Sequence, residues 1–196
     1  MIPSRPLDPI ARQEAILLAR NVLRARPLYL DTETTGLDAA AEVIEISLVD
    51  SSGLPLYESL VQPRRAVPSD ATRIHGLTDA DLRAAPTWPE VWRAVEPLLQ
   101  DRTIATYNAA FDRKMLQQTH ASYRLDWSDE AARFFCVMEL YARYYGARRR
   151  TGGAFRWHSL DQAATFLGLA LPNRHRATDD ARLARAVLER IAEQTP

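Results

Sequence analysis

The hydrophobic residues of this chain change their spacing along the sequence, from a helical pattern to a strand pattern. Residues 8–26 place apolar side chains along one face of a helix, with arginine and glutamate between them. Pro27 ends this pattern, and the short apolar run after it predicts a buried strand. Residues 42–51 and 54–62 alternate apolar and polar positions on either side of a Ser-Ser-Gly turn. The three runs together predict an antiparallel meander of strands.

The second half of the chain alternates short strand patterns with helical patterns. Strands are predicted at 103–107 and 134–137, and residues 69–78 are expected to be irregular. Helices are predicted at 79–83, 88–99, 109–119, 138–145, 160–166 and 178–193. Four of them follow a residue typical of an N-cap, namely Thr78, Thr87, Asn108 and Ser159. These patterns predict an α/β fold with one mixed five-stranded sheet, made of an antiparallel meander plus parallel strands and flanked by helices.

Length and composition predict one domain, because 196 residues of which 46% are hydrophobic can bury a single large core. No apolar run approaches the ~18 residues of a membrane span, and the N-terminus lacks the apolar core of a signal peptide. The single cysteine, Cys136, excludes an intramolecular disulfide and fits a reducing compartment. We therefore expect a cytoplasmic protein with no membrane partner.

The formal net charge is zero, with 25 basic and 25 acidic residues, which argues against broad coating of duplex nucleic acid. It does not exclude an enzyme that acts on nucleic acid, because bound metal ions would offset a cluster of acids and local arginines could hold a strand. One local cluster is Arg148-Arg149-Arg150, in a glycine-flanked segment that we expect to form a mobile basic loop.

Asp31 and Glu33 lie at the end of the first predicted strand. Since strand side chains alternate, both carboxylates face the same side, about 6 to 7 Å apart, and repel each other. A divalent cation with oxygen ligands would relieve this repulsion, and the turn at Thr34-Thr35-Gly36 could bring backbone amides to a phosphate. For an isolated pair of acids, the alternative is a strand that ends in a polar turn.

A second block of polar residues follows the strand at 103–107. Asn108 and Asp112 are four residues apart at the start of a helix, so both project from one face at the carboxyl end of that strand. Asp112 can therefore join Asp31 and Glu33. The alternative for Asp112 alone is ordinary compensation of the helix dipole.

The third block contains His175, Asp179 and Asp180. Five helical residues turn a side chain through about 140°, so His175 and Asp180 converge only if His175 precedes the helix. Asp179 is the competing ligand, and geometry alone does not choose between the two aspartates. A surface imidazole is the alternative for His175. Four acids and one histidine are the groups needed for two-metal hydrolysis of a phosphodiester with Mg²⁺ or Mn²⁺, and an imidazole can accept a proton near neutral pH.

The order and spacing of these blocks resemble the motifs of the DEDD exonucleases, in their His-containing, DnaQ-like branch, which includes the proofreading subunit of bacterial DNA polymerase III. The blocks are Asp31-x-Glu33-Thr34-Thr35-Gly36-Leu37, Ile74-His75-Gly76-Leu77-Thr78, Tyr107-Asn108-Ala109-x-Phe111-Asp112 and His175-x-Ala177-x-x-Asp180-Ala181. The resemblance implies a ribonuclease H-like fold and release of nucleoside 5′-monophosphates from a 3′ end. Residues 1–26 are then an N-terminal helical extension, and residues 27–196 are the exonuclease domain.

The resemblance also implies roles for individual residues. The two divalent ions would be bound by Asp31, Glu33, Asp112 and Asp180, and His175 would be the general base. Three residues, Thr34, Gly36 and Leu37, would contact the terminal nucleotide. Three others, His75, Asn108 and Phe111, would line its pocket, where an aromatic ring can stack on any base.

The expected substrate is the 3′ end of single-stranded DNA, in repair or proofreading, with RNA or short oligonucleotides as the alternative. A non-catalytic nucleic-acid-binding module is the alternative from a different class. The sequence stops soon after its last predicted helix, so no tail for a polymerase partner is evident, and we expect a stand-alone nuclease.

Overall fold

The computed structural model describes residues 8–128, 132–149, 153–170 and 175–195. Five strands form one sheet in the order β3-β2-β1-β4-β5. They are β1 (Leu28–Thr34), β2 (Val43–Val49), β3 (Pro55–Leu60), β4 (Arg102–Thr106) and β5 (Ala132–Cys136). The first three pair antiparallel, whereas β4 runs parallel to β1 and β5 runs parallel to β4. The predicted meander and mixed five-stranded sheet are confirmed.

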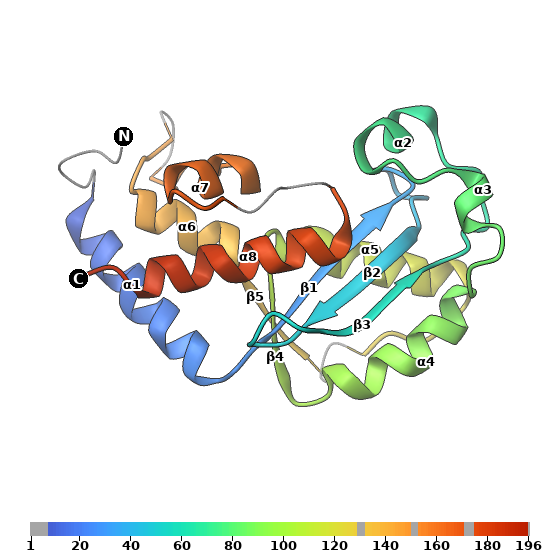
Figure 1. Cartoon of the computed structure of the whole chain (residues 1–196), viewed down its shortest axis with the longest axis horizontal. Coiled ribbons are helices and arrows are strands. Elements are labelled where there is room, and N and C mark those ends of the chain that lie inside the picture. Colours follow the sequence, from blue (N-terminus) through green and yellow to red (C-terminus); the bar gives the residue numbers. More distant parts are fainter. Residues whose placement is uncertain (1–7, 129–131, 150–152, 171–174, 196) are drawn as a thin grey trace.

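Eight helices are formed by the described residues. They are α1 (Pro9–Arg24), α2 (Ser69–His75), α3 (Asp79–Leu82), α4 (Trp88–Leu99), α5 (Ala109–Ser122), α6 (Val137–Tyr145), α7 (Leu160–Phe166) and α8 (Ala177–Ala192). Helices α2 and α3 lie beyond one end of the sheet, and α1 crosses the C-terminal end of α8 (Figure 1). None of the described helices combines the length and apolar character that a membrane crossing would require.

Two hydrophobic cores lie on opposite faces of the sheet, because successive side chains of β1 point in opposite directions. Tyr29 enters the core that α1, α6, α7 and α8 share, whereas Leu28 and Leu30 enter the core with α4 and α5. A strand covered on both faces is apolar at nearly every position, which explains the continuous run that starts β1. Asp31 follows this run on the face of Tyr29, so the sheet presents it toward α8.

The predicted helix starts are largely confirmed. Thr78 and Ser159 are N-caps whose side chains accept hydrogen bonds from the backbone of Asp81 and Gln162. Thr87 is the N-cap of α4, and its backbone N–H and hydroxyl both donate to the Glu90 carboxylate. Asn108 occupies the N-cap position of α5, but its side chain makes no capping hydrogen bond. That side chain is exposed.

The expectation of an irregular segment at residues 69–78 is wrong, because α2 forms within it. Its last turn closes at Gly76, which has a φ of 78° and donates a 2.8 Å backbone hydrogen bond to Thr72. Glycine adopts this left-handed conformation without steric cost. Gly76 was the signal for a helix C-terminus, but α2 has too few residues to display a hydrophobic period.

The segment expected to form a mobile basic loop makes several contacts where it is described. Arg148 pairs with Phe155 in an antiparallel β-bridge and forms a 2.8 Å salt bridge with Asp8. The guanidinium of Arg149 lies 4.7 Å from the ring centroid of Trp157. Arg150 lies outside the described residues. We call residues 147–149 and 153–157 the basic hairpin.

Candidate active site

Three carboxylates meet where β1 ends against the first turn of α8. Oxygen atoms of Asp31, Glu33 and Asp180 all lie within 4.8 Å of one another. The Oδ1 atom of Asp180 is buried and has no hydrogen-bond partner among the described residues. Buried oxygens normally have a partner, and three converging carboxylate oxygens are the donor set that hard divalent cations prefer. The cluster therefore fits a metal ion.

Burial and mutual repulsion make these acids difficult to ionise without a cation. Burial, followed by the charges of Asp112 and Asp180, raises the pKa of Asp31 well above its ordinary value. Burial is also the main reason that the pKa of Glu33 rises to about 8 and that of Asp180 to about 7. A bound cation would favour the charged forms, so metal binding at this cluster must release protons.

Asp112 approaches the same cluster from α5. Its Oδ1 accepts a 2.9 Å hydrogen bond from the Thr32 hydroxyl, and its Oδ2 accepts a 2.5 Å bond from the Thr106 hydroxyl. Burial outweighs these bonds and raises the pKa of Asp112 to about 6. Among the neighbouring acids, Asp112 has the largest effect on the pKa of Asp31. Asp112 is not one of the three residues with oxygens within 4.8 Å, so it faces the cluster from one side.

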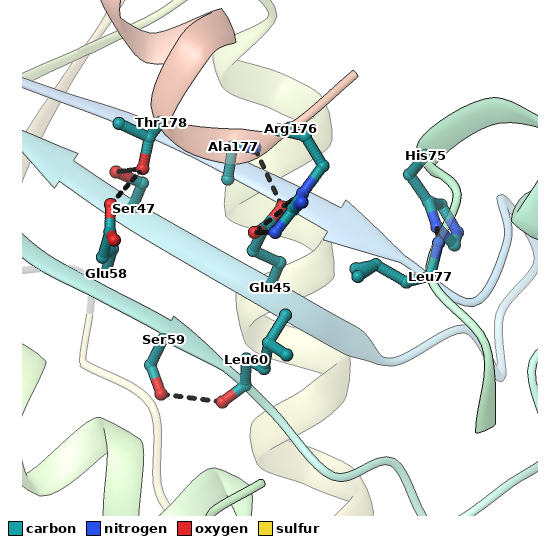
Figure 2. Close-up of polar contacts among 10 residues, drawn as sticks. All are labelled: Glu45, Ser47, Glu58, Ser59, Leu60, His75, Leu77, Arg176, Ala177 and Thr178. Atoms are coloured by element: carbon teal, nitrogen blue, oxygen red, sulfur yellow. Dashed lines mark hydrogen bonds and ion pairs between the residues drawn. The ribbon is translucent and has the colours of Figure 1, made fainter. Parts of the chain in front are cut away.

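The start of α8 is attached to β2 by a carboxylate. Glu45 accepts hydrogen bonds from the Arg176 side chain and a 3.0 Å bond from the backbone N–H of Ala177 (Figure 2). Asp180 follows within the first turn and is buried, whereas Asp179 is half-buried and lies outside the group of three acids. His175 is exposed and directly precedes the N-cap, with a φ of 48°. It therefore lies before the helix, as convergence with Asp180 requires.

The residues expected to contact a nucleotide differ in their exposure. Thr34 is buried, and its hydroxyl donates a 2.8 Å bond to the Gly36 carbonyl. The side chain of Leu37 is 76% exposed, Phe111 is half-buried and Asn108 is exposed.

His75, which is also expected to line the pocket, is buried, and burial lowers its pKa. Its Nδ1 accepts a 3.0 Å bond from the Leu77 backbone N–H, and its buried Nε2 has no hydrogen-bond partner among the described residues (Figure 2).

Sequence reasoning missed the residues that hold the acids in place. Glu45 and Arg176 fix the start of α8, and Thr32 and Thr106 hold Asp112. One sign of such contacts was present, namely a glutamate within β2, a strand that is buried at every position. An ionised side chain in such a strand needs a cationic partner, but the sequence does not say which arginine supplies it.

The comparison with known families agrees with this geometry. The profile of the RNase_T family, described as Exonuclease, matches residues 28–188. The chain belongs to this exonuclease family. The predicted resemblance to DnaQ-like exonucleases is thereby confirmed, and the matched residues contain all four blocks on which it was based.

The exonuclease chain is similar to several known proteins. It is 36% identical to a protein named uncharacterized exonuclease CP81 of Escherichia phage 186, over 89% of this chain and 92% of that protein. It is 32% identical to the PolC-type DNA polymerase III of Thermotoga maritima, over 85% of this chain but only 12% of the polymerase. The nuclease domain of 3′hExo, described as a DEDDh family member bound to rAMP, superposes with a TM-score of 0.65 at 18% identity, over 83% of this chain and 89% of that one. The ribonuclease H-like fold is confirmed.

Proposed function

We propose that the protein is a metal-dependent 3′–5′ exonuclease that hydrolyses single-stranded DNA from its 3′ end and releases nucleoside 5′-monophosphates. The observation that carries this proposal is the convergence of Asp31, Glu33 and Asp180, with the unpartnered Oδ1 of Asp180. Acids in this arrangement favour a divalent cation over a proton near neutral pH. Family membership supports the reaction type.

The four acids that would hold two divalent ions are Asp31, Glu33, Asp112 and Asp180. When bound, Mg²⁺ or Mn²⁺ would polarise the phosphate and stabilise the leaving oxygen. Oxygen-only ligands favour these hard cations. The hydrogen bonds from Thr32 and Thr106 keep the Asp112 carboxylate oriented and favour its charged form. His175 would accept the proton of the attacking water, because it is exposed and lies directly before the N-cap of the helix that carries Asp180.

The residues around the cluster suit a terminal nucleotide. With Nδ1 of His75 acting as an acceptor, the neutral ring carries its proton on Nε2, so the buried side of the ring is a hydrogen-bond donor. The exposed side chains of Leu37 and Ile74 would offer apolar surface to a base, and the half-buried Phe111 would add an aromatic ring. Thr34, Gly36 and Asn108 would complete the contacts. Apolar and stacking contacts accept any base, as an exonuclease requires.

DNA is the leading substrate because the polymerase to which the chain is similar acts on DNA by its name, and RNA is the alternative because one structural neighbour holds rAMP. We further propose that residues 27–196 form the exonuclease domain, that residues 1–26 are its N-terminal extension, and that the protein acts in the cytoplasm.

The test is a time course with matched DNA and RNA oligonucleotides, labelled at either the 5′ or the 3′ end, in Mg²⁺, Mn²⁺ or EDTA. The proposal predicts a descending ladder from 5′-labelled DNA and immediate release of labelled mononucleotide from 3′-labelled DNA, both abolished by EDTA. Faster cleavage of RNA would reverse the order of substrates. Binding without cleavage in every metal would contradict the enzymatic proposal and favour a binding module.

A further inference from the structure

Glu45 lies beside the acid cluster but has other partners. In the antiparallel register, Glu45 on β2 pairs with Glu33 on β1, so their side chains are neighbours on one face of the sheet. Glu45 is 8% exposed, and its charge contributes to the raised pKa values of Asp31, Glu33 and Asp180. A fourth acid at this position increases the repulsion within the cluster. Its presence therefore requires a separate explanation.

The hydrogen bonds of Glu45 explain why it is not a spare metal ligand. Its Oε1 accepts bonds of 3.0 and 2.5 Å from Nε and Nη2 of Arg176. Its Oε2 lies 3.1 Å from the same Nε and accepts a 3.0 Å bond from the Ala177 backbone N–H. Both oxygens are therefore directed at the start of α8 and not at the acids.

This arrangement supplies a helix cap from another part of the chain. Arg176 is the N-cap residue of α8, yet its side chain makes no capping hydrogen bond to the helix. Ala177 is the first helical residue, and its N–H would otherwise lack a partner. The Glu45 carboxylate satisfies this N–H and also places a negative charge at the positive end of the helix dipole. One side chain of β2 thus sets the height and rotation of α8.

A second contact fixes the same turn. The Thr178 hydroxyl lies 2.8 Å from the Ser47 hydroxyl on β2 and 2.9 Å from the Glu58 carboxylate on β3 (Figure 2). Together with the Glu45 contacts, they hold the residues that lie between His175 and Asp180, the two residues that the proposed reaction needs. His175 immediately precedes Arg176, and Asp180 follows two residues after Thr178.

We propose that Glu45 and Arg176 form a positioning pair, which holds the start of α8 so that His175 and Asp180 meet the metal cluster in reactive geometry. Neither residue touches the substrate in this role. The inference rests on the proposed exonuclease function. It adds two positioning residues to the five candidate catalytic residues. Misplacement of a reacting group by about 1 Å can reduce the rate by about a hundredfold.

The test compares Glu45→Ala, Glu45→Gln and Arg176→Ala with a matched control, Arg185→Ala. Arg185 also attaches α8 to the β2–β3 region, through a 3.0 Å hydrogen bond to the Ser51 carbonyl, but it lies on a later turn of the helix. Each variant is assayed for kcat and KM on a single-stranded oligonucleotide, for Mn²⁺ affinity from the free-Mn²⁺ electron paramagnetic resonance signal, and for melting temperature. All assays are run well below the lowest melting transition.

The positioning role predicts that Glu45→Ala lowers kcat by about a hundredfold and weakens Mn²⁺ binding by about tenfold, while KM changes by less than about twofold. Glu45→Gln, which keeps an acceptor for Ala177 and loses the ion pair, should lie between Glu45→Ala and the wild type. Arg185→Ala should lower the melting temperature but leave kcat and Mn²⁺ affinity at wild-type values.

Wild-type kcat and Mn²⁺ affinity in Glu45→Ala would overturn the inference. Equal losses in Arg185→Ala would also overturn it, because any weakening of α8 would then have the same effect. If the wild-type protein cleaves no oligonucleotide, the proposed function fails, and the Mn²⁺ titration still tests whether the pair positions Asp180.

Discussion

The hydroxyl of Thr106 donates a 2.5 Å hydrogen bond to Oδ2 of Asp112 at the carboxyl end of β4. Both residues are buried, and Asp112 is further held through its Oδ1 by the Thr32 hydroxyl. An ionised carboxylate can only accept hydrogen bonds, so both hydroxyls favour the charged form and oppose the effect of burial. The strand that leads to Asp112 therefore also prepares it to bind a cation.

Thr106→Val should remove one of these donors while keeping the side-chain shape. The pKa of Asp112 then rises further above about 6, and the acid limb of the pH–activity profile moves to higher pH. At pH 7 we expect kcat/KM to fall roughly tenfold, as for loss of a charge-assisted hydrogen bond of about 1.5 kcal/mol. Thr103→Val, earlier on the same strand, is the control. A Thr106→Val profile that overlays the wild type would contradict this role.

Without added metal, stability should fall as pH rises from about 4 to about 8. Over this range the folded protein keeps protons on Asp31, Glu33 and Asp180 that the unfolded chain has lost, because their folded pKa values are raised. At pH 8, Mg²⁺ should restore the loss by binding only the folded cluster. Unfolding at pH 5 and pH 8, with EDTA or Mg²⁺, measures both effects.

Asp31→Asn is the matched variant for this prediction, because it removes one charge and keeps the shape. When the unfolding free energy of the wild type is subtracted from that of the variant, the contributions of distant titrating groups cancel. In EDTA the variant should gain stability relative to wild type as pH rises, and Mg²⁺ should stabilise it less. A pH-independent difference would mean that the cluster does not carry this repulsion.

The basic hairpin predicts a contribution to binding of the strand upstream of the 3′ end. Trp157 is 54% exposed beneath the Arg149 guanidinium, and stacked aromatic and arginine side chains bind single strands. The Tyr107 hydroxyl donates to the carbonyls of His158 and Ser159, which attaches the segment directly after the hairpin to the end of β4 beside Asn108. Arg149→Ala should weaken binding of a long oligonucleotide and reduce its logarithmic salt slope by about 0.7.

The control for the hairpin is Arg93→Ala, an exposed arginine on α4. Hydrolysis of a small aryl ester of thymidine 5′-monophosphate, which cannot reach the hairpin, should be unchanged in both variants. An unchanged salt slope in Arg149→Ala would show that the hairpin takes no part in strand binding.

The first helix should contribute to stability through one face only. Ile16 is fully buried in the core shared with α8, whereas the adjacent Leu17 is 47% exposed. Ile16→Ala should lower the free energy of unfolding by about 2–4 kcal/mol through lost burial and a residual cavity, and Leu17→Ala by less than about 1 kcal/mol. Denaturant titration gives both values. Equal, small losses would mean that α1 is only loosely attached.

Local patterns predicted much of this structure because their causes are local. The helix starts at Thr78, Thr87 and Ser159 follow from hydrogen bonds within three residues, and the spacing of Asp31 and Glu33 follows from strand geometry. Helix rotation made a position of His175 before the helix the condition for its convergence with Asp180, and α8 begins after His175. These relationships require no knowledge of the tertiary fold.

Other features depend on contacts between distant segments and could not be read from local patterns. Glu45 and Arg176 are 131 residues apart, and no local sequence pattern identifies either residue as the partner of the other. The choice of Asp180 over Asp179 depends on which side of α8 is buried against the sheet, and Asp180 lies on that side. Asn108 has the residue type of a cap, but the fold leaves its side chain exposed and without a capping bond.

The most direct test of the central claim is release of nucleoside 5′-monophosphates from single-stranded DNA by the wild type and Asp31→Ala, in Mg²⁺ and in EDTA. We expect release by the wild type in Mg²⁺ only, and at least about a thousandfold less by Asp31→Ala, which should remain folded because one repelling carboxylate is gone. Full activity of Asp31→Ala in Mg²⁺, or of the wild type in EDTA, would contradict the claim that this acid cluster performs metal-dependent hydrolysis.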